Sequence, residues 1–191
     1  MYLGLDLSLT GSGLCLIDNN YQIIGEKKLS APGLSGVGRL YFLEMEFNNI
    51  ISAYINDLSC IYCCIENPAY RAEGRIIDIG EWLGICKLNL YKKGIPFIPV
   101  APSQLKKYIL GKGVGNKTLI LLDIFKRYKI EIRDDDIGDA YVLARICKDF
   151  HNVYILDNKD YLKGLPSFQK EVILAIIKTT EANKLKEANK L

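Results

Sequence analysis

Three strand-like segments within the first 29 residues constrain the fold more than any other feature of the sequence. Apolar segments at residues 2–5 and 14–17 flank a polar turn rich in Ser, Thr and Gly, and a third segment covers residues 21–29. Short turns between neighbouring strands favour antiparallel pairing. These residues therefore predict a three-stranded meander at the start of the chain.

Helical and strand-like patterns alternate in the rest of the chain. The expected elements are a helix at 39–56, a strand at 60–65, a helix at 75–93, a strand at 96–100, helices at 103–110, 116–128 and 136–150, and a terminal helix at 171–190. We expect Ser103 to cap the helix that it opens. A meander followed by β-α-β units predicts an α/β fold, with a mixed sheet and helices on both of its faces.

Composition narrows the class of protein. The chain has 191 residues, of which 49% are hydrophobic, so one substantial core can form. No apolar run approaches the roughly 20 residues of a membrane helix, and no basic segment precedes an apolar stretch at the N-terminus. We therefore expect a soluble intracellular protein without membrane contact. Six cysteines without paired metal-ligand spacing are expected to be reduced core residues.

Four acidic residues lie at positions where an α/β sheet usually forms its site. Asp6 ends the first strand, Glu66 ends the fourth, and Asp136 and Asp139 lie three apart at the start of a helix. Carboxylates brought together would repel one another unless cations joined them. Mg²⁺ suits such a group, and two ions ~3.5–4 Å apart can promote phosphodiester hydrolysis.

Each acid also has a purely structural interpretation. Asp6 could cap the following turn, Glu66 could be a surface charge, and Asp136 and Asp139 could be ordinary acids of a helix N-terminus. Asp135 competes with Asp136 for the third position, because residues 134–136 are all aspartate. The basic residues clustered between positions 106 and 129 could likewise be a solvated helix face. The net charge of +3 is too small to indicate nucleic-acid binding by itself.

The order of these motifs resembles the RuvC-type Holliday junction resolvases. Residues 3–13, Leu-Gly-Leu-Asp-Leu-Ser-Leu-Thr-Gly-Ser-Gly, are similar to the family's first motif, and Ile-Glu at 65–66 to its second. Residues 136–140, Asp-Ile-Gly-Asp-Ala, are similar to its closing Asp-x-x-Asp-Ala motif. Residues 100–106 and 111–117 look like its lysine-bearing segment. The resemblance covers about residues 1–150 and implies a ribonuclease H-like fold.

The resemblance implies a role for each of these residues. Asp6, Glu66, Asp136 and Asp139 would be catalytic carboxylates that hold two Mg²⁺ ions, with Mn²⁺ as an alternative, and Lys106 and Lys117 would be active-site lysines. The expected nucleic-acid contacts are Tyr70, Arg71, Lys107 and Lys112. The protein would be a homodimeric endonuclease with a nuclease domain over 1–150 and a C-terminal helical extension over 151–191. Its substrate would be branched DNA, most specifically the four-way junction formed in recombination and repair.

Other functions remain as alternatives. A second ribonuclease H-like nuclease, acting on RNA–DNA hybrids or structured RNA, would use the same acids. An actin-like ATPase would need a second Gly-rich phosphate loop, and a non-catalytic DNA-binding module would gain nothing from acids near phosphates. The run at 111–118, Gly-Lys-Gly-Val-Gly-Asn-Lys-Thr, resembles a nucleotide-binding P-loop, but Asn116 stands where that motif needs Gly.

Overall fold

A computed structural model describes residues 1–54, 61–67 and 76–188. Its elements, in chain order, are β1 (Tyr2–Asp6), β2 (Ser12–Ile17), β3 (Ile23–Leu29), α1 (Gly36–Tyr54), β4 (Tyr62–Glu66), α2 (Ile76–Lys92), β5 (Phe97–Val100), α3 (Pro102–Leu110), α4 (Lys117–Tyr128), α5 (Asp135–Phe150), a π-helical turn (His151–Ile155), α6 (Lys159–Gly164) and α7 (Ser167–Ala188). Among these residues, no helix is long and apolar enough to cross a bilayer.

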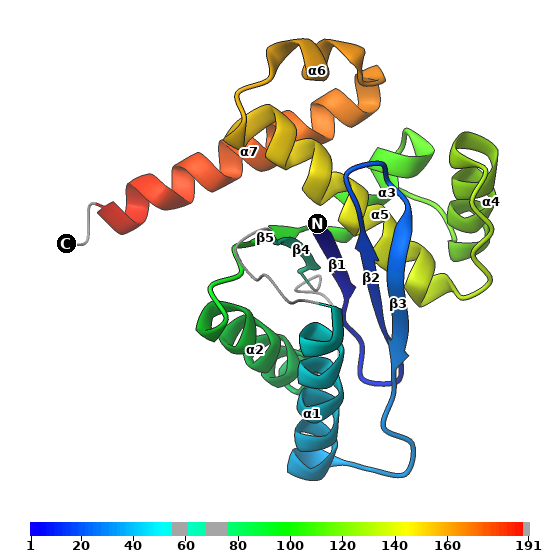
Figure 1. The fold of residues 1–191 in the computed structure, drawn as a ribbon, viewed down its shortest axis with the longest axis vertical. Coiled ribbons are helices and arrows are strands. Elements are labelled where there is room, and N and C mark those ends of the chain that lie inside the picture. Colours follow the sequence, from blue (N-terminus) through cyan, green and yellow to red (C-terminus); the bar gives the residue numbers. More distant parts are fainter. Residues whose placement is uncertain (55–60, 68–75, 189–191) are drawn as a thin grey trace.

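The strands form one mixed sheet in the order β3-β2-β1-β4-β5 (Figure 1). Strands β1 and β2, and β2 and β3, pair antiparallel, which confirms the predicted meander. Strand β4 lies parallel to β1 on one side and to β5 on the other. Because β1 and β4 run in the same direction, with Leu5 opposite Ile65, their C-terminal residues Asp6 and Glu66 lie at the same edge of the sheet.

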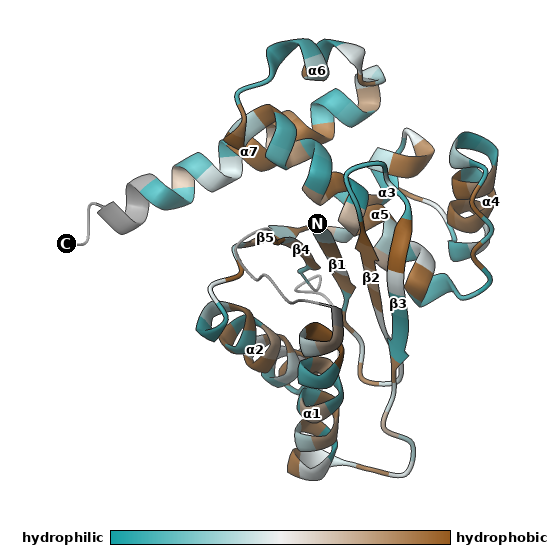
Figure 2. Cartoon of the chain, in the orientation of Figure 1, coloured by the Kyte–Doolittle hydropathy of each residue, from teal (hydrophilic) through white to brown (hydrophobic). Residues whose placement is uncertain are grey.

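Helices cover both faces of the sheet, as predicted. Leu3 and Leu5 of β1 belong to a core cluster with residues of α1 and α2. The alternate residue Tyr2 belongs to a second cluster, with residues of α3, α4, α5 and α7. Helix α5 crosses that second face (Figure 1). Figure 2 shows the inner strand β2 as largely apolar, whereas the edge strand β3 is hydrophilic near its arrowhead.

Two glycines let α5 approach the sheet closely. A Cβ atom on Gly4 of β1 would lie 1.9 Å from the backbone oxygen of Ala140, and one on Gly13 of β2 would lie 1.9 Å from that of Asp136. Any side chain at either position would collide with the backbone of α5. The absence of these two side chains therefore brings the acidic N-terminal turns of α5 to the C-terminal end of β1.

The predicted N-cap of α3 is wrong. Ser103 does not cap α3, because the helix begins one residue earlier, at Pro102, with Ala101 as its N-cap residue. Proline suits the first helical position, where a backbone N–H has no helical partner. The Gln104 side-chain oxygen accepts a hydrogen bond of 2.9 Å from the backbone N–H of Ala101.

The C-terminal helices were only partly predicted. The terminal helix α7 begins at Ser167 and not at residue 171, and the short helix α6 and the π-helical turn were not expected. The N-terminal half of α7 packs on the domain: Val172, Ile173 and Ile176 belong to the α5 core cluster. The division of the chain at residue 150 stays a prediction.

The cysteines lie in the core, as expected. Those that the structure describes are free thiols with buried side chains: Cys15, Cys63, Cys64, Cys86 and Cys147. Cys60 lies outside the described residues.

Candidate active site

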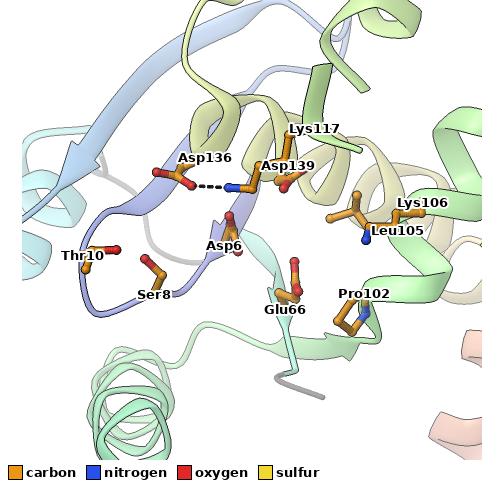
Figure 3. Close-up of a pocket in the computed structure, with 10 residues that line it drawn as sticks. All are labelled: Asp6, Ser8, Thr10, Glu66, Pro102, Leu105, Lys106, Lys117, Asp136 and Asp139. Carbon is orange, nitrogen blue, oxygen red and sulfur yellow. Dashed lines mark hydrogen bonds and ion pairs between the residues drawn. The ribbon is translucent and has the colours of Figure 1, made fainter. Parts of the chain in front are cut away.

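A cavity of about 340 Å³ opens at the C-terminal edge of β1 and β4 (Figure 3). It is lined by Asp6, Ser8, Thr10, Glu66, Pro102, Leu105, Lys106, Lys117, Asp136 and Asp139. The structure thus brings together all four predicted carboxylates and both predicted active-site lysines, although the first and the last of them, Asp6 and Asp139, lie 133 positions apart in the sequence.

Strand pairing and helix capping position the carboxylates. Asp6 and Glu66 end two neighbouring parallel strands. The Asp134 side chain accepts hydrogen bonds from the backbone N–H groups of Asp136 and Ile137, at 2.9 and 3.1 Å, and so fixes the start of α5. Asp136 and Asp139 then share one face of the first helical turn, which is turned toward Asp6.

Burial gives these acids unusual electrostatics. The residue Asp6 is 9% exposed and Asp139 is 8% exposed. Burial, reinforced by the charges of Glu66 and Asp139, raises the pKa of Asp6 well above its usual range. Burial and the Glu66 charge raise the pKa of Asp139 to about 7. Burial also raises the pKa of Glu66, against the opposing effects of Asp6, Lys106 and Lys117.

One carboxylate oxygen has no internal partner. Oδ1 of Asp139 is buried and accepts no hydrogen bond from the described residues. A buried acceptor without a partner costs roughly 1–3 kcal/mol. The donor set of this cavity consists of hard carboxylate oxygens, which are the ligands that Mg²⁺ and Mn²⁺ prefer. The residues present therefore fit a divalent cation bound between β1, β4 and α5.

Two lysines contact Asp136 from different elements. Nζ of Lys117, the first residue of α4, lies 2.8 Å from Oδ1 of Asp136 and 3.0 Å from Oδ2 of Asp135. Nζ of Lys28, on β3, lies 2.7 Å from Oδ2 of Asp136 and 2.9 Å from Oδ2 of Asp134. Figure 3 shows the Lys117 contact above the cavity. Each oxygen of the Asp136 carboxylate thus pairs with a lysine ammonium group.

A second acidic group overlaps the cavity. Oxygens of Asp134, Asp135 and Asp136 lie within 4.8 Å of one another, close enough to hold one cation. Asp134 already caps α5, and Asp135 is 41% exposed and pairs with Lys117. Only Asp136 of these three lines the cavity, which favours Asp136 over Asp135 as the partner of Asp6, Glu66 and Asp139.

Of the predicted nucleic-acid contacts, the two that the structure describes, Lys107 and Lys112, are not among the residues that line the cavity. Lys107 pairs with Glu171 of α7 at 2.6 Å, and Lys112 is exposed in the loop before α4. Tyr70 and Arg71 lie outside the described residues.

The P-loop-like run follows helix α3 and not a strand. Asn116 is the N-cap of α4, where its side chain accepts a hydrogen bond from Leu119 N–H.

Sequence reasoning missed three polar side chains near the acids. Ser8 and Thr10 line the cavity from the loop after β1, within the motif that the sequence had identified only through Asp6. Their place in the first motif was the available signal. Lys28 lies on β3, far from every motif in the sequence, and only the sheet order places it beside Asp136.

Comparison with known proteins agrees with this arrangement. No protein-family model matches the chain. It is 28% identical over 151 residues to the crossover junction endodeoxyribonuclease RuvC of Rhizobium etli, covering 76% of this chain and 86% of the relative. It is 26% identical over 151 residues to the protein of that name from Agrobacterium fabrum, with the same coverage of both chains.

Solved structures show the same fold. RuvC of Thermus thermophilus superimposes with a TM-score of 0.62 at 18% identity, covering 81% of this chain and 95% of the other. Its complex with a Holliday junction substrate gives a TM-score of 0.60 at 17% identity, covering 74% and 88%. The predicted ribonuclease H-like fold is therefore confirmed, and so is the resemblance to the RuvC-type resolvases.

Proposed function

We propose that this protein is a RuvC-type, metal-dependent endonuclease that resolves four-way DNA junctions. The observation that supports this most is the meeting of Asp6, Glu66, Asp136 and Asp139 in one cavity with two lysines. The same cavity lies on a fold shared with a protein solved in complex with a Holliday junction substrate. Fold alone does not define activity, so the proposal depends on the acids and their setting.

The four carboxylates are the residues that would hold Mg²⁺ or Mn²⁺. Bound there, divalent cations would lower the pKa of a water molecule and stabilise the charge that develops on the phosphodiester. The buried acids favour cation binding for a simple reason. Their pKa values are raised because burial and mutual repulsion disfavour the charged forms, and a cation relieves both effects.

The lysines would act on the substrate. Lys106 lines the cavity on the side of Glu66, and its charge lowers the pKa of that acid. Lys117 lines the cavity on the side of Asp136. A phosphate placed between them would meet a positive charge on two sides. Such fixed charges stabilise a phosphodiester transition state more than the bound ground state, where the same phosphate is less negative.

We also propose a homodimer, because resolving a junction requires two matched cuts. The outer face of α2 is the best candidate for the interface. Ile77, Leu88 and Tyr91 are exposed there, at 74%, 51% and 79%. Gly80 and Gly84 lie between them, and a Cβ atom on either would meet nothing within 4 Å. Small residues between apolar ones let two helices approach closely, and a two-fold axis would pair this face with itself.

Substrate preference distinguishes this proposal from the alternative function, a nuclease that acts on RNA–DNA hybrids or structured RNA. The same radiolabelled sequence should be offered to the protein in Mg²⁺ as a four-way junction, a linear duplex and an RNA–DNA hybrid. We expect paired cuts in the junction, at a rate at least tenfold above those for the other two substrates. Faster cleavage of the hybrid would transfer the proposal to a ribonuclease acting on hybrids or structured RNA.

A further inference from the structure

Lys28 contacts the acidic site from outside the cavity. It lies on the edge strand β3, and its ammonium group joins Oδ2 of Asp136 to Oδ2 of Asp134, at 2.7 and 2.9 Å. Lys28 is not among the residues that line the cavity. These hydrogen bonds to Asp136 and Asp134 raise the pKa of Lys28.

The two oxygens of Asp136 therefore have different surroundings. Oδ2 is held by Lys28, on the side of β3. Oδ1 contacts Lys117, which lines the cavity, as Figure 3 shows. The Asp136 side chain is only 13% exposed, so the surrounding residues and the contact with Lys28 together restrict the orientation of its carboxylate. Lys28 thus holds one oxygen of Asp136 on the side of β3 and leaves the other on the side of the cavity.

The loop after β1 leaves a passage for this contact. A Cβ atom on Gly11 would lie 2.4 Å from Cε of Lys28 and 3.0 Å from Oδ2 of Asp136. A side chain at position 11 would occupy the space through which Lys28 reaches Asp136, so the end of the lysine would have to shift. Gly11 is buried, and its φ is not in the left-handed region, so close approach and not backbone conformation requires glycine here.

We propose that Lys28 is a positioning residue for the metal ligand Asp136. It holds Oδ2, so that Asp136 offers one oxygen, Oδ1, to a divalent cation in the cavity. It also keeps one positive charge beside the acids when a cation is bound. This inference rests on the proposed function, because Asp136 is a ligand only if the cavity binds a metal. Partners of this kind orient metal ligands and commonly change activity when removed.

Lys28→Met should change two properties in opposite directions: Mg²⁺ affinity should rise and the rate of junction cleavage should fall. Loss of the positive charge favours Mg²⁺ binding, and the freed carboxylate can offer both oxygens to the ion. The altered coordination places the ion wrongly for cleavage. We therefore expect Mg²⁺ affinity above that of the wild type, together with junction cleavage at saturating Mg²⁺ that is roughly tenfold slower.

Three further variants separate position from charge. Lys27→Met removes the same charge from the neighbouring residue of β3, which is exposed and has no ion pair among the described residues. Lys28→Arg keeps the charge and the hydrogen bonds. Gly11→Ala keeps every charge but blocks the approach of Lys28 to Asp136. We expect Lys27→Met and Lys28→Arg to resemble the wild type, and Gly11→Ala to cleave more slowly.

The experiment combines calorimetric titration of Mg²⁺ into the DNA-free protein, thermal melting, and single-turnover junction cleavage. Slow cleavage by Lys28→Met at saturating Mg²⁺, with tighter Mg²⁺ binding than in the wild type and rescue by Lys28→Arg, supports the proposal. Equal behaviour of Lys28→Met and Lys27→Met overturns it. A joint loss of Mg²⁺ affinity and melting temperature also overturns it, since Lys28 would then only support the start of α5.

The Mg²⁺ titration keeps this test independent of the substrate. If the wild type cuts no junction, the proposed function fails, but the calorimetric comparison of Lys28→Met with Lys27→Met still applies. Tighter Mg²⁺ binding by Lys28→Met alone would then support the positioning role, and unchanged binding would contradict it.

Discussion

Nζ of Lys117 lies 2.8 Å from Oδ1 of Asp136, the carboxylate oxygen on the cavity side. A cation that binds Asp136 must compete with this ammonium group for the same oxygen. The Lys117 side chain is 50% exposed and sits at the first position of α4, so its ammonium group can leave Asp136 and move within the cavity when a cation takes the oxygen. Lys117 would thus neutralise an acid before metal binding and a substrate phosphate afterwards.

The first prediction concerns the two cavity lysines. Lys106→Ala and Lys117→Ala should each lower the single-turnover rate at saturating DNA by roughly 100-fold, because they act on charge that develops in the transition state. Junction affinity should change only a few-fold, since one phosphate contact is a small part of a wide electrostatic footprint. Lys126→Ala, at an exposed position of α4, is the control. Equal losses of affinity and rate would show that the lysines only bind DNA.

The second prediction concerns Asp6. Asp6→Asn should abolish cleavage and leave junction binding intact or tighter, because the acid holds cations and repels phosphates. Gel-shift binding in Ca²⁺ and cleavage in Mg²⁺ measure the two properties separately. A variant that loses junction binding and thermal stability together would show that Asp6 is a structural cap of the turn that follows β1.

The third prediction is a pH dependence of stability. The pKa of Asp139 is about 7 in the folded protein, above its unfolded value. Between about pH 4 and 7 the folded state therefore binds more protons than the unfolded state, so the free energy of unfolding falls as pH rises through this range. Above pH 7 the full cost of burying the ionised carboxylate is present.

Asp139→Asn removes that cost. Without added metal, the variant should be more stable than the wild type at pH 8 by about 1–3 kcal/mol, and the difference should shrink toward pH 5. Mg²⁺ at pH 8 should raise the melting temperature of the wild type more than that of the variant. Chemical denaturation at pH 8 and pH 5 measures the difference in unfolding free energy between the variant and the wild type. A variant that is less stable than the wild type at pH 8 would refute the account of Asp139 as a strained, buried acid.

The fourth prediction concerns assembly. Gly84→Arg places a long charged side chain on the exposed face of α2, where a Cβ atom meets nothing within the protomer. The folded monomer should tolerate it, while a dimer packed through α2 should dissociate, which sedimentation velocity would detect. The control is Lys87→Arg, which introduces the same side chain into the same helix at a half-buried position that is already basic. An unchanged dimer in Gly84→Arg would place the interface elsewhere.

Much of the site could be predicted because it depends on strand order. Asp6 and Glu66 end two apolar strands, and parallel neighbours bring their ends together, so position in sequence was enough to pair them. Asp136 and Asp139 share a helix face through their spacing alone. The position of that helix was less accessible, because it depends on backbone contacts at Gly4 and Gly13 that no periodicity reveals.

Other features depend on contacts between distant residues. Lys28 and Asp136 lie 108 positions apart, and nothing around Lys28 distinguishes it from the neighbouring Lys27 until the sheet is built. Ser103 was chosen as a cap from residue type, but Pro102 moves the start of the helix by one residue. Helix α6 has six residues and none of them is buried, so its sequence carries too weak an apolar pattern to predict it.

Cleavage of a synthetic four-way junction with a fixed crossover point, with and without Mg²⁺, tests the central claim most directly. The account predicts no cleavage without metal. With Mg²⁺ it predicts symmetrically placed nicks on two opposed strands, which ligation would seal into linear duplexes. Cleavage that is independent of divalent metal, or Mg²⁺-dependent cuts that fall equally on a linear duplex of the same sequence, would contradict it.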